Sequence, residues 1–275
     1  MLIAGAVCPH PPLLIPAALG AAASDPPAEL RKVTEAAAQA VARLAGARPD
    51  LIAVVGGGPV DREYGPATAG GLHDYGIDFT VGMGEPVLPL SLTVGRWLLE
   101  CAGVLEPAGG GADVAGGTTR DGTGVAANVA GGDVAAEGKP VAVLFQAVAQ
   151  HASPGDCLKL GIVLAERAPR VALLAMGDAS ARPAREAPGV PDLAAQEYDE
   201  DVAEALAAAD ARWLARLDPA RDNELVVAGR AAWQVLAGAA GGGTGGCRLQ
   251  GRLLCMSAPY GVTYLVASWE EGRTD

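Results

Sequence analysis

The chain has 275 residues, with 32 Asp and Glu against 20 Lys and Arg, and therefore a formal net charge of −12 at pH 7. A surface this acidic repels nucleic-acid phosphates and anionic lipids, so we expect neither nucleic acid nor a membrane as a partner. Hydrophobic residues make up 50% and charged residues 19%, which excludes disorder of the whole chain and is typical of a soluble globular protein.

Cysteine usage and the apolar runs predict where the protein resides. The five cysteines are an odd number and form no C-x-x-C pair, so the sequence favours reduced thiols over a disulfide framework or a structural zinc site. No run approaches the roughly 18 apolar residues of a membrane helix, and the opening MLIAGAVCPHPPLL lacks the basic residues of a signal peptide. We therefore expect a cytoplasmic protein.

The first elements read as a strand, a helix and a second strand. Leu2–Val7 is a short apolar run that stops at Cys8-Pro9-His10-Pro11-Pro12, which predicts a buried strand followed by a rigid loop. Apolar residues at helical spacing predict a helix over 27–47. Leu51–Val55 is a continuous apolar run, typical of a strand buried on both faces. This order predicts a parallel βαβ unit.

The later elements continue the alternation of strands and helices. The pattern predicts helices over 91–101, 153–167, 193–217 and 223–240, strands over 141–148 and 171–176, and a closing hairpin of 249–256 with 262–269. Residues 105–139 contain ten glycines and no hydrophobic period, so we expect a mobile insertion there. The sequence thus predicts a single α/β domain over 1–275, with a central, mostly parallel sheet flanked by helices.

Several candidate functional residues follow the carboxyl ends of predicted strands, where open α/β sheets bind ligands. His10 follows the first strand, although an isolated histidine in a proline-rich loop is more often a packed one. Gly56, Gly57 and Gly58 follow the second, where converging backbone N–H groups can cradle a phosphate. Asp178 and Ser180 follow strand 171–176 and can orient a ligand or cap a turn.

Three motifs together resemble the class III extradiol ring-cleavage dioxygenases, in particular the protocatechuate-type catalytic B subunit. They are C-P-H-P-P at 8–12, P-D-L-I-A-V-V at 49–55 and M-G-D-A-S at 176–180. Later segments are similar to the same superfamily, including its Memo branch: A-P-G at 187–189, Y-D at 198–199, A-G-R at 228–230 and L-A-G-A at 236–239. The resemblance implies a mononuclear non-haem Fe(II), held by two His and a Glu, that cleaves a catechol with oxygen.

Carried over residue by residue, the resemblance leaves few of the family's metal-binding groups. His10 matches the first iron ligand, but Gly58 stands at the second histidine and Ala181 at the acid/base histidine. The closest acid to the third ligand position is Glu224. His73, with Asp74 and Asp78 beside it, or His151 can substitute from other loops.

Three functions remain open. The first is a dioxygenase-like protein without the standard iron site or any cofactor, which keeps a cleft for a small ligand, such as an aromatic one, or for a protein partner. The second is an active Fe(II) ring-cleavage dioxygenase with a nonstandard ligand set of His10, His73 and either Glu224 or Asp178. The third is a metal-independent hydrolase or isomerase with His10 as base near Ser180 or Asp178.

The cleft of the first hypothesis is lined by Gly56, Gly57, Gly58, Asp178 and Ser180. The resemblance also implies a homodimer or a partner subunit.

Overall fold

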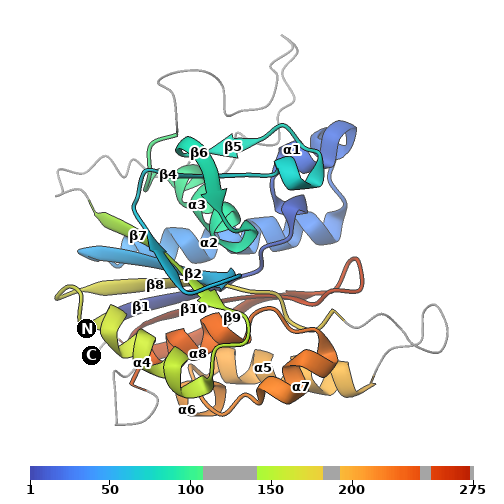
Figure 1. Cartoon of the computed structure of the whole chain (residues 1–275). Helices are drawn as coiled ribbons and strands as arrows, with labels where there is room; N and C mark the ends of the chain where they lie inside the picture. Colours follow the sequence, from blue (N-terminus) through green and yellow to red (C-terminus); the bar gives the residue numbers. More distant parts are fainter. Residues whose placement is uncertain (108–140, 182–192, 242–248, 273–275) are drawn as a thin grey trace.

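A computed structural model describes residues 1–107, 141–181, 193–241 and 249–272 of the chain (Figure 1). The strands are β1 (Leu2–Cys8), β2 (Leu51–Gly58), β3 (Arg62–Tyr64), β4 (Thr68–Gly71), β5 (Thr80–Val81), β6 (Met83–Leu88), β7 (Ala142–Ala149), β8 (Val171–Met176), β9 (Leu249–Ser257) and β10 (Tyr264–Glu271). The α-helices are α1 (Pro16–Leu19), α2 (Ala28–Gly46), α3 (Leu90–Cys101), α4 (Pro154–Ala165), α5 (Leu193–Ala207), α6 (Ala211–Leu214), α7 (Pro219–Leu225) and α8 (Arg230–Ala239). Short 3-10 turns cover Pro12–Leu14, Gly20–Ser24 and His73–Tyr75.

A seven-stranded sheet in the order β3-β7-β2-β8-β1-β10-β9 forms the centre of the molecule. Its four middle strands are parallel, as expected from the βαβ order. The pairings of β3 with β7, β1 with β10, and β10 with β9 are antiparallel. The expectation of a mostly parallel sheet therefore needs correction to a mixed sheet, because the closing hairpin and the short β3 extend the parallel centre in the opposite sense.

Helices cover both faces of this sheet, in three layers (Figure 1). Strand alternation sorts the side chains of β8 between the two sides. Val171, Leu173 and Ala175 join the core under α5 and α8, whereas Leu174 and Met176 join the core under α2 and α3. Because both faces are covered, the middle strands read as uninterrupted apolar runs.

A second sheet of three short strands, in the order β5-β4-β6, was not expected from the sequence. It packs on α3, where a Cβ at Gly70 would lie 2.2 Å from the Thr93 Oγ1 atom. The buried Arg96 side chain of α3 donates to the Pro66 carbonyl oxygen and pairs with Glu100, with 2.9 Å between Nε and Oε1. A buried arginine thus ties the loop before β4 to the helix.

The two long helices expected over 193–217 and 223–240 are each interrupted. The first becomes α5 and α6, separated at Ala209, which has φ +51°, before Asp210 caps α6. The second becomes α7 and α8, separated at Val226, which has φ +56°. A left-handed residue ends a helix by redirecting the chain.

The glycine-rich segment expected to be a mobile insertion at 105–139 lies outside the described residues from 108 on. No helix of the described residues has the length and apolar character needed to cross a membrane.

Candidate functional site

His10 and Asp178 meet at the carboxyl edge of the large sheet. His10 follows β1 and Asp178 follows β8, and these two strands are parallel neighbours. The Asp178 Oδ1 atom accepts a hydrogen bond of 2.8 Å from the His10 backbone N–H and lies 3.7 Å from the His10 Nδ1 atom. The structure therefore brings two of the sequence-predicted site residues side by side.

Both side chains of the pair are mostly buried but keep some exposure to solvent. The side chain of His10 is 14% exposed and that of Asp178 is 16% exposed. The buried Nδ1 atom of His10 has no hydrogen-bond partner within the described part of the chain. Buried polar atoms are normally paired, so this nitrogen is the kind of group that a ligand or a water molecule satisfies.

Tyr264, at the start of β10, is a neighbour that the sequence analysis did not single out. Burial, together with the negative charges of Asp178 and of an ionised Tyr260, raises the pKa of Tyr264 to about 12. Its hydroxyl is therefore neutral at physiological pH. No motif marks this tyrosine in the sequence, because its place at the edge depends on the antiparallel pairing of β10 with β1.

The start of α8 closes over the backbone of Asp178. The Asp178 carbonyl oxygen accepts hydrogen bonds from Ala228 N at 3.1 Å and Gly229 N at 2.9 Å. A Cβ at Gly177 would lie 2.2 Å from the Gly229 Cα, so this approach requires glycine. Two hydrogen bonds thus hold the Asp178 carbonyl oxygen, in an approach that requires glycine at position 177. The Asp178 side chain points to His10 instead.

Ser180 does not face the same edge. It is buried, its hydroxyl donates to the Asp199 Oδ2 atom at 2.6 Å, and its backbone N–H donates to Oδ1 at 3.0 Å. Asp199 is itself buried in α5. The two hydrogen bonds attach the chain after β8 to α5, which is a structural use of the predicted catalytic serine.

Replacing Ser180 with alanine should destabilise the protein rather than weaken ligand binding. The buried Asp199 carboxylate loses a charged hydrogen bond, a loss of about 1.5–3 kcal/mol in unfolding free energy. Denaturant unfolding measures it, and Ser24→Ala at an exposed position is the control expected to change little. An Ser180→Ala protein of unchanged stability would contradict this role.

Gly56, Gly57 and Gly58 form the last three residues of β2 rather than a loop. They pair in register with Ala147, Val148 and Ala149 of β7. A Cβ at Gly56 would lie 2.5 Å from the Ser91 Oγ atom, and one at Gly58 would lie 2.8 Å from the Ala147 Cβ. These two glycines serve close packing, whereas Gly57 has nothing nearer than the Ala228 carbonyl oxygen at 3.9 Å.

The remaining candidate metal ligands are not gathered around His10. His73 is half-exposed and pairs with Asp78, with 3.4 Å between Nε2 and Oδ1. Glu224 is exposed on α7 and pairs with Arg221 at 3.2 Å. His151 is exposed after β7, which lies three strands away from β1 in the sheet. Among the described residues, no three His, Cys, Asp or Glu side chains are placed to hold a metal ion.

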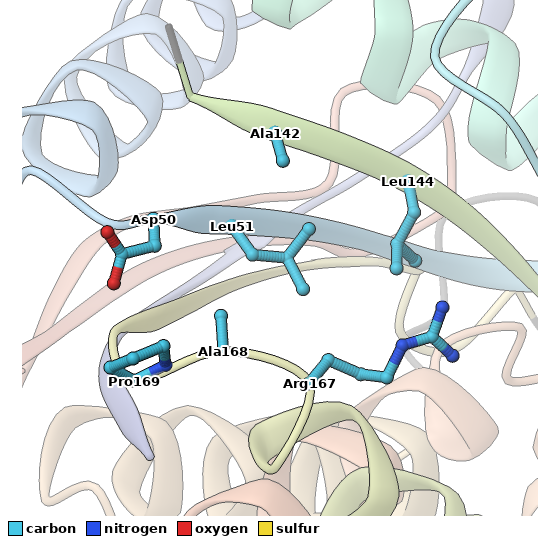
Figure 2. A pocket seen from close by; sticks show the side chains of 7 residues that line it. All are labelled: Asp50, Leu51, Ala142, Leu144, Arg167, Ala168 and Pro169. Atoms are coloured by element: carbon cyan, nitrogen blue, oxygen red, sulfur yellow. The ribbon is translucent and has the colours of Figure 1, made fainter. Parts of the chain in front are cut away.

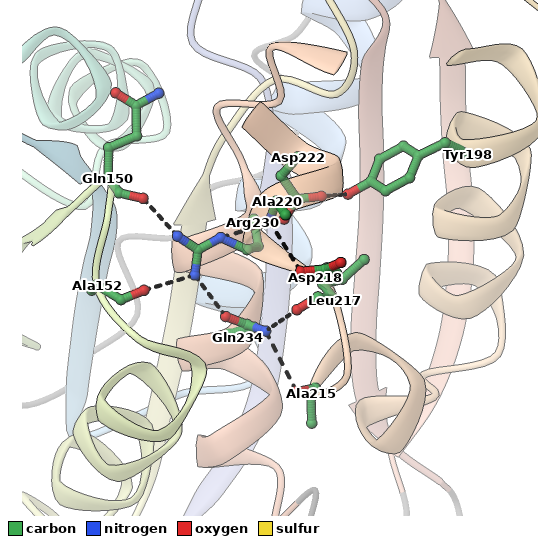
Figure 3. A network of polar contacts seen from close by, with 10 residues as sticks. All are labelled: Gln150, Ala152, Tyr198, Ala215, Leu217, Asp218, Ala220, Asp222, Arg230 and Gln234. Atoms are coloured by element: carbon green, nitrogen blue, oxygen red, sulfur yellow. Dashed lines mark hydrogen bonds and ion pairs between the residues drawn. The ribbon is translucent and has the colours of Figure 1, made fainter. Parts of the chain in front are cut away.

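A buried polar network connects side chains of α5, α7 and α8 (Figure 3). The Tyr198 hydroxyl donates to the Asp222 Oδ1 atom at 2.6 Å, and the Arg230 Nε atom lies 3.3 Å from Asp222 Oδ2. Arg230 also donates to the carbonyl oxygens of Gln150 at 2.6 Å and Ala152 at 2.9 Å. The network joins the loop after β7 to three helices, and no sequence motif marks it.

Two surface hollows lie away from the His10–Asp178 pair. One, of about 390 Å³, lies where β2 and β7 begin and is shown in Figure 2; it is lined by Asp50, Leu51, Ala142, Leu144, Arg167, Ala168 and Pro169. The other, of about 270 Å³, is lined by Tyr198, Trp213, Arg216, Leu217, Asp218 and Arg221. Neither includes a residue of the cleft predicted from the sequence.

The chain was compared with protein-family models, curated proteins and solved structures. No protein-family model matches the chain, and no curated protein matches it. Among solved structures, an uncharacterized protein from Escherichia coli K12 is 12% identical, with a TM-score of 0.43, and the match covers 98% of this chain and 100% of that chain. At this identity and TM-score the likeness bears on neither activity nor ligand.

Proposed function

We propose that this protein is a metal-free, ligand-binding relative of the class III extradiol dioxygenases. It holds a small ligand, aromatic in kind, at the carboxyl edge of the large sheet. The observation that carries the proposal is the His10–Asp178 pair, partly exposed and with an unpartnered, buried His10 Nδ1 atom. An unsatisfied buried polar atom is costly unless a bound molecule completes its hydrogen bonding.

The chemistry of the pair favours a ligand that carries a hydroxyl group. An ionised Asp178 carboxylate accepts a hydrogen bond from such a group, and an imidazole nitrogen can either donate or accept one. Tyr264, with a neutral hydroxyl, begins β10, the strand that pairs with β1. Hydrogen bonds to an ionised carboxylate are the stronger class, so Asp178 should provide most of the affinity.

The donor set at this edge does not fit Fe(II). The resemblance implies two histidines and a glutamate as ligands, yet only His10 of the matched residues lies at this edge with a side chain that can bind iron. Glu224, the closest acid to the third ligand position, is exposed on α7 and pairs with Arg221. Gly58 has no side chain and packs against Ala147, and position 181 is alanine. Cys8 does not make up the deficit, because its side chain is fully buried in the core under α2 and α3. We therefore derive no oxygenase step.

Ligand binding is tested by thermal unfolding in the presence of nucleotides, phosphosugars and hydroxylated aromatic compounds without a carboxylate. A ligand at one hundred times its Kd stabilises the folded state by about 2.7 kcal/mol, which raises Tm by several degrees. Asp178→Asn keeps an oxygen that accepts from the His10 backbone N–H but removes the charge, and should abolish the rise. Glu224→Gln, with the same charge change at an exposed position, should retain it. A flat response in the wild type would contradict small-ligand binding and leave a protein partner.

Metal content separates this proposal from the dioxygenase alternative. Protein purified without chelator, and again after anaerobic loading with Fe(II) and desalting, should hold far less than one iron per chain by plasma mass spectrometry. His10→Ala should then leave that content unchanged. Near-stoichiometric iron in the wild type that is lost in His10→Ala would contradict the metal-free proposal and support ring-cleavage chemistry with a nonstandard ligand set.

A further inference from the structure

The hollow between α5, α6 and α7 contains chemistry that the proposed function does not use. It measures about 270 Å³, somewhat below the roughly 300–1,000 Å³ of pockets that enclose drug-sized ligands. A molecule built on a single ring fits this size. The hollow shares no residue with the His10–Asp178 pair, so the two are separate binding places.

The apolar wall of the hollow contains Trp213, which is more exposed than the other three tryptophans of the chain. Trp97, Trp233 and Trp269 are 7%, 0% and 1% exposed, whereas Trp213 is half-buried and lines the hollow. The buried Tyr198 lines it too, with its hydroxyl already donating to Asp222. An accessible indole beside a phenol ring offers the flat surfaces on which another ring stacks.

The rim of the hollow is cationic, on a chain whose net charge is −12. The Arg216 side chain is exposed and makes no hydrogen bond or ion pair with any other described residue. Arg221 pairs with Glu224 at 3.2 Å and donates to the Ala194 carbonyl oxygen at 3.4 Å. Asp218 also lines the hollow, where its carboxylate accepts a hydrogen bond of 3.0 Å from the Ala220 backbone N–H as the cap of α7. The two arginines outweigh this one negative charge. A free guanidinium beside a second one is suited to a carboxylate.

The larger hollow of Figure 2 lacks such free groups. Its Arg167 makes two parallel hydrogen bonds to the Glu63 carboxylate, of 3.1 and 3.0 Å, and its Asp50 accepts from the Arg170 backbone N–H at 3.2 Å. Both charges have partners within the protein. The difference singles out the smaller hollow.

We propose that the hollow of Trp213, Arg216 and Arg221 is a second binding site, for a small carboxylate with a flat apolar body. The ring of the ligand stacks on Trp213 and its carboxylate lies between the two guanidinium groups. The two arginines attract the carboxylate of the ligand, whereas the acidic surface of the rest of the molecule repels ligands of higher negative charge.

The test follows the indole N–H resonances of the four tryptophans by NMR during titration of the full chain with benzoate. The resonance of Trp213, assigned from Trp213→Phe, should shift saturably. Arg216→Gln should weaken binding about tenfold or more, the effect of losing one charged hydrogen bond. Arg212→Gln is the matched control, since Arg212 is exposed on the same short helix as Trp213 but does not line the hollow.

Three further measurements test the proposal. Benzamide, a neutral molecule of the same shape, should bind at least tenfold more weakly, and acetate, which has no ring, should leave the Trp213 resonance in place. Equal binding of benzamide, or equal weakening by Arg216→Gln and Arg212→Gln, overturns the site. Loss of the benzoate shift in Asp178→Asn also overturns it, because benzoate would then occupy the carboxyl edge instead. Asp178→Asn otherwise tests the proposed function alone, so the two proposals can fail separately.

Discussion

Gly238→Ala is expected to lower the free energy of unfolding by about 3 kcal/mol, at the upper end of the cost of overpacking. A Cβ at Gly238 would lie 2.2 Å from the Leu158 carbonyl oxygen and 2.7 Å from its Cα. The crossing is reciprocal, since a Cβ at Gly161 would lie 2.0 Å from the Val235 carbonyl oxygen. Both obstacles are backbone atoms, so α4 and α8 must move apart to admit even a methyl group.

Such a movement is costly because α8 is buried throughout its length and contacts the large sheet on its other side. Denaturant unfolding followed by circular dichroism measures the loss. Gly46→Ala is the matched control, in the last turn of α2 with nothing within 4 Å of its Cβ position; it should leave stability unchanged or raise it by up to about 1 kcal/mol. A Gly238→Ala protein as stable as wild type would refute the close crossing of α4 and α8.

The sequence predicted the elements whose apolar pattern is long and uninterrupted. β1, β8 and α2 lie within one or two residues of their expected bounds, because burial on both faces of a sheet, or on one face of a long helix, leaves a strong periodic signal. β4 is short and contains two glycines, and β5 has only two residues. β6 is exposed over most of its length. Strands of this kind carry no alternation to recognise.

The helix breaks at Ala209 and Val226 depend on tertiary structure. Neither residue type favours a left-handed backbone, so nothing local distinguishes them from helix interior. At Val226 the chain must turn so that Ala228 and Gly229 reach the Asp178 carbonyl oxygen. The helical spacing of apolar residues in the sequence therefore continues across Val226, although the chain changes direction there.

The positions of candidate residues at the sheet edge can be predicted where topology alone decides them, but not where side-chain direction matters. Parallel neighbouring strands bring His10 and Asp178 to one edge, which follows from the βαβ order. Ser180 is two residues further along and turns into the core toward Asp199. The glycines at 56–58 look like a loop in the sequence, whereas their pairing with β7 continues β2 through them.

Asp222→Ala is expected to lower the free energy of unfolding by about 3–5 kcal/mol at neutral pH, the cost of removing one partner from a buried ion pair. It leaves the buried guanidinium of Arg230 without a carboxylate and the Tyr198 hydroxyl without an acceptor (Figure 3). Glu224→Ala, an exposed acid of the same helix paired only with Arg221 at the surface, should change stability by less than about 1 kcal/mol. Similar losses in the two variants would contradict the role of the network.

The same aspartate predicts how stability depends on pH. Burial raises the pKa of Asp222 from 3.8 to about 6, in spite of its hydrogen bond from Tyr198 and the charge of Arg230. Between these two values the folded state binds more protons than the unfolded state. Protonation of Asp222 therefore adds stability that is fully present below about pH 4 and is lost as the pH rises to about 6. Asp222→Asn cannot titrate and should flatten this part of the profile. Parallel pH profiles for wild type and Asp222→Asn, measured by denaturant unfolding across this window, would show that desolvation does not dominate at Asp222.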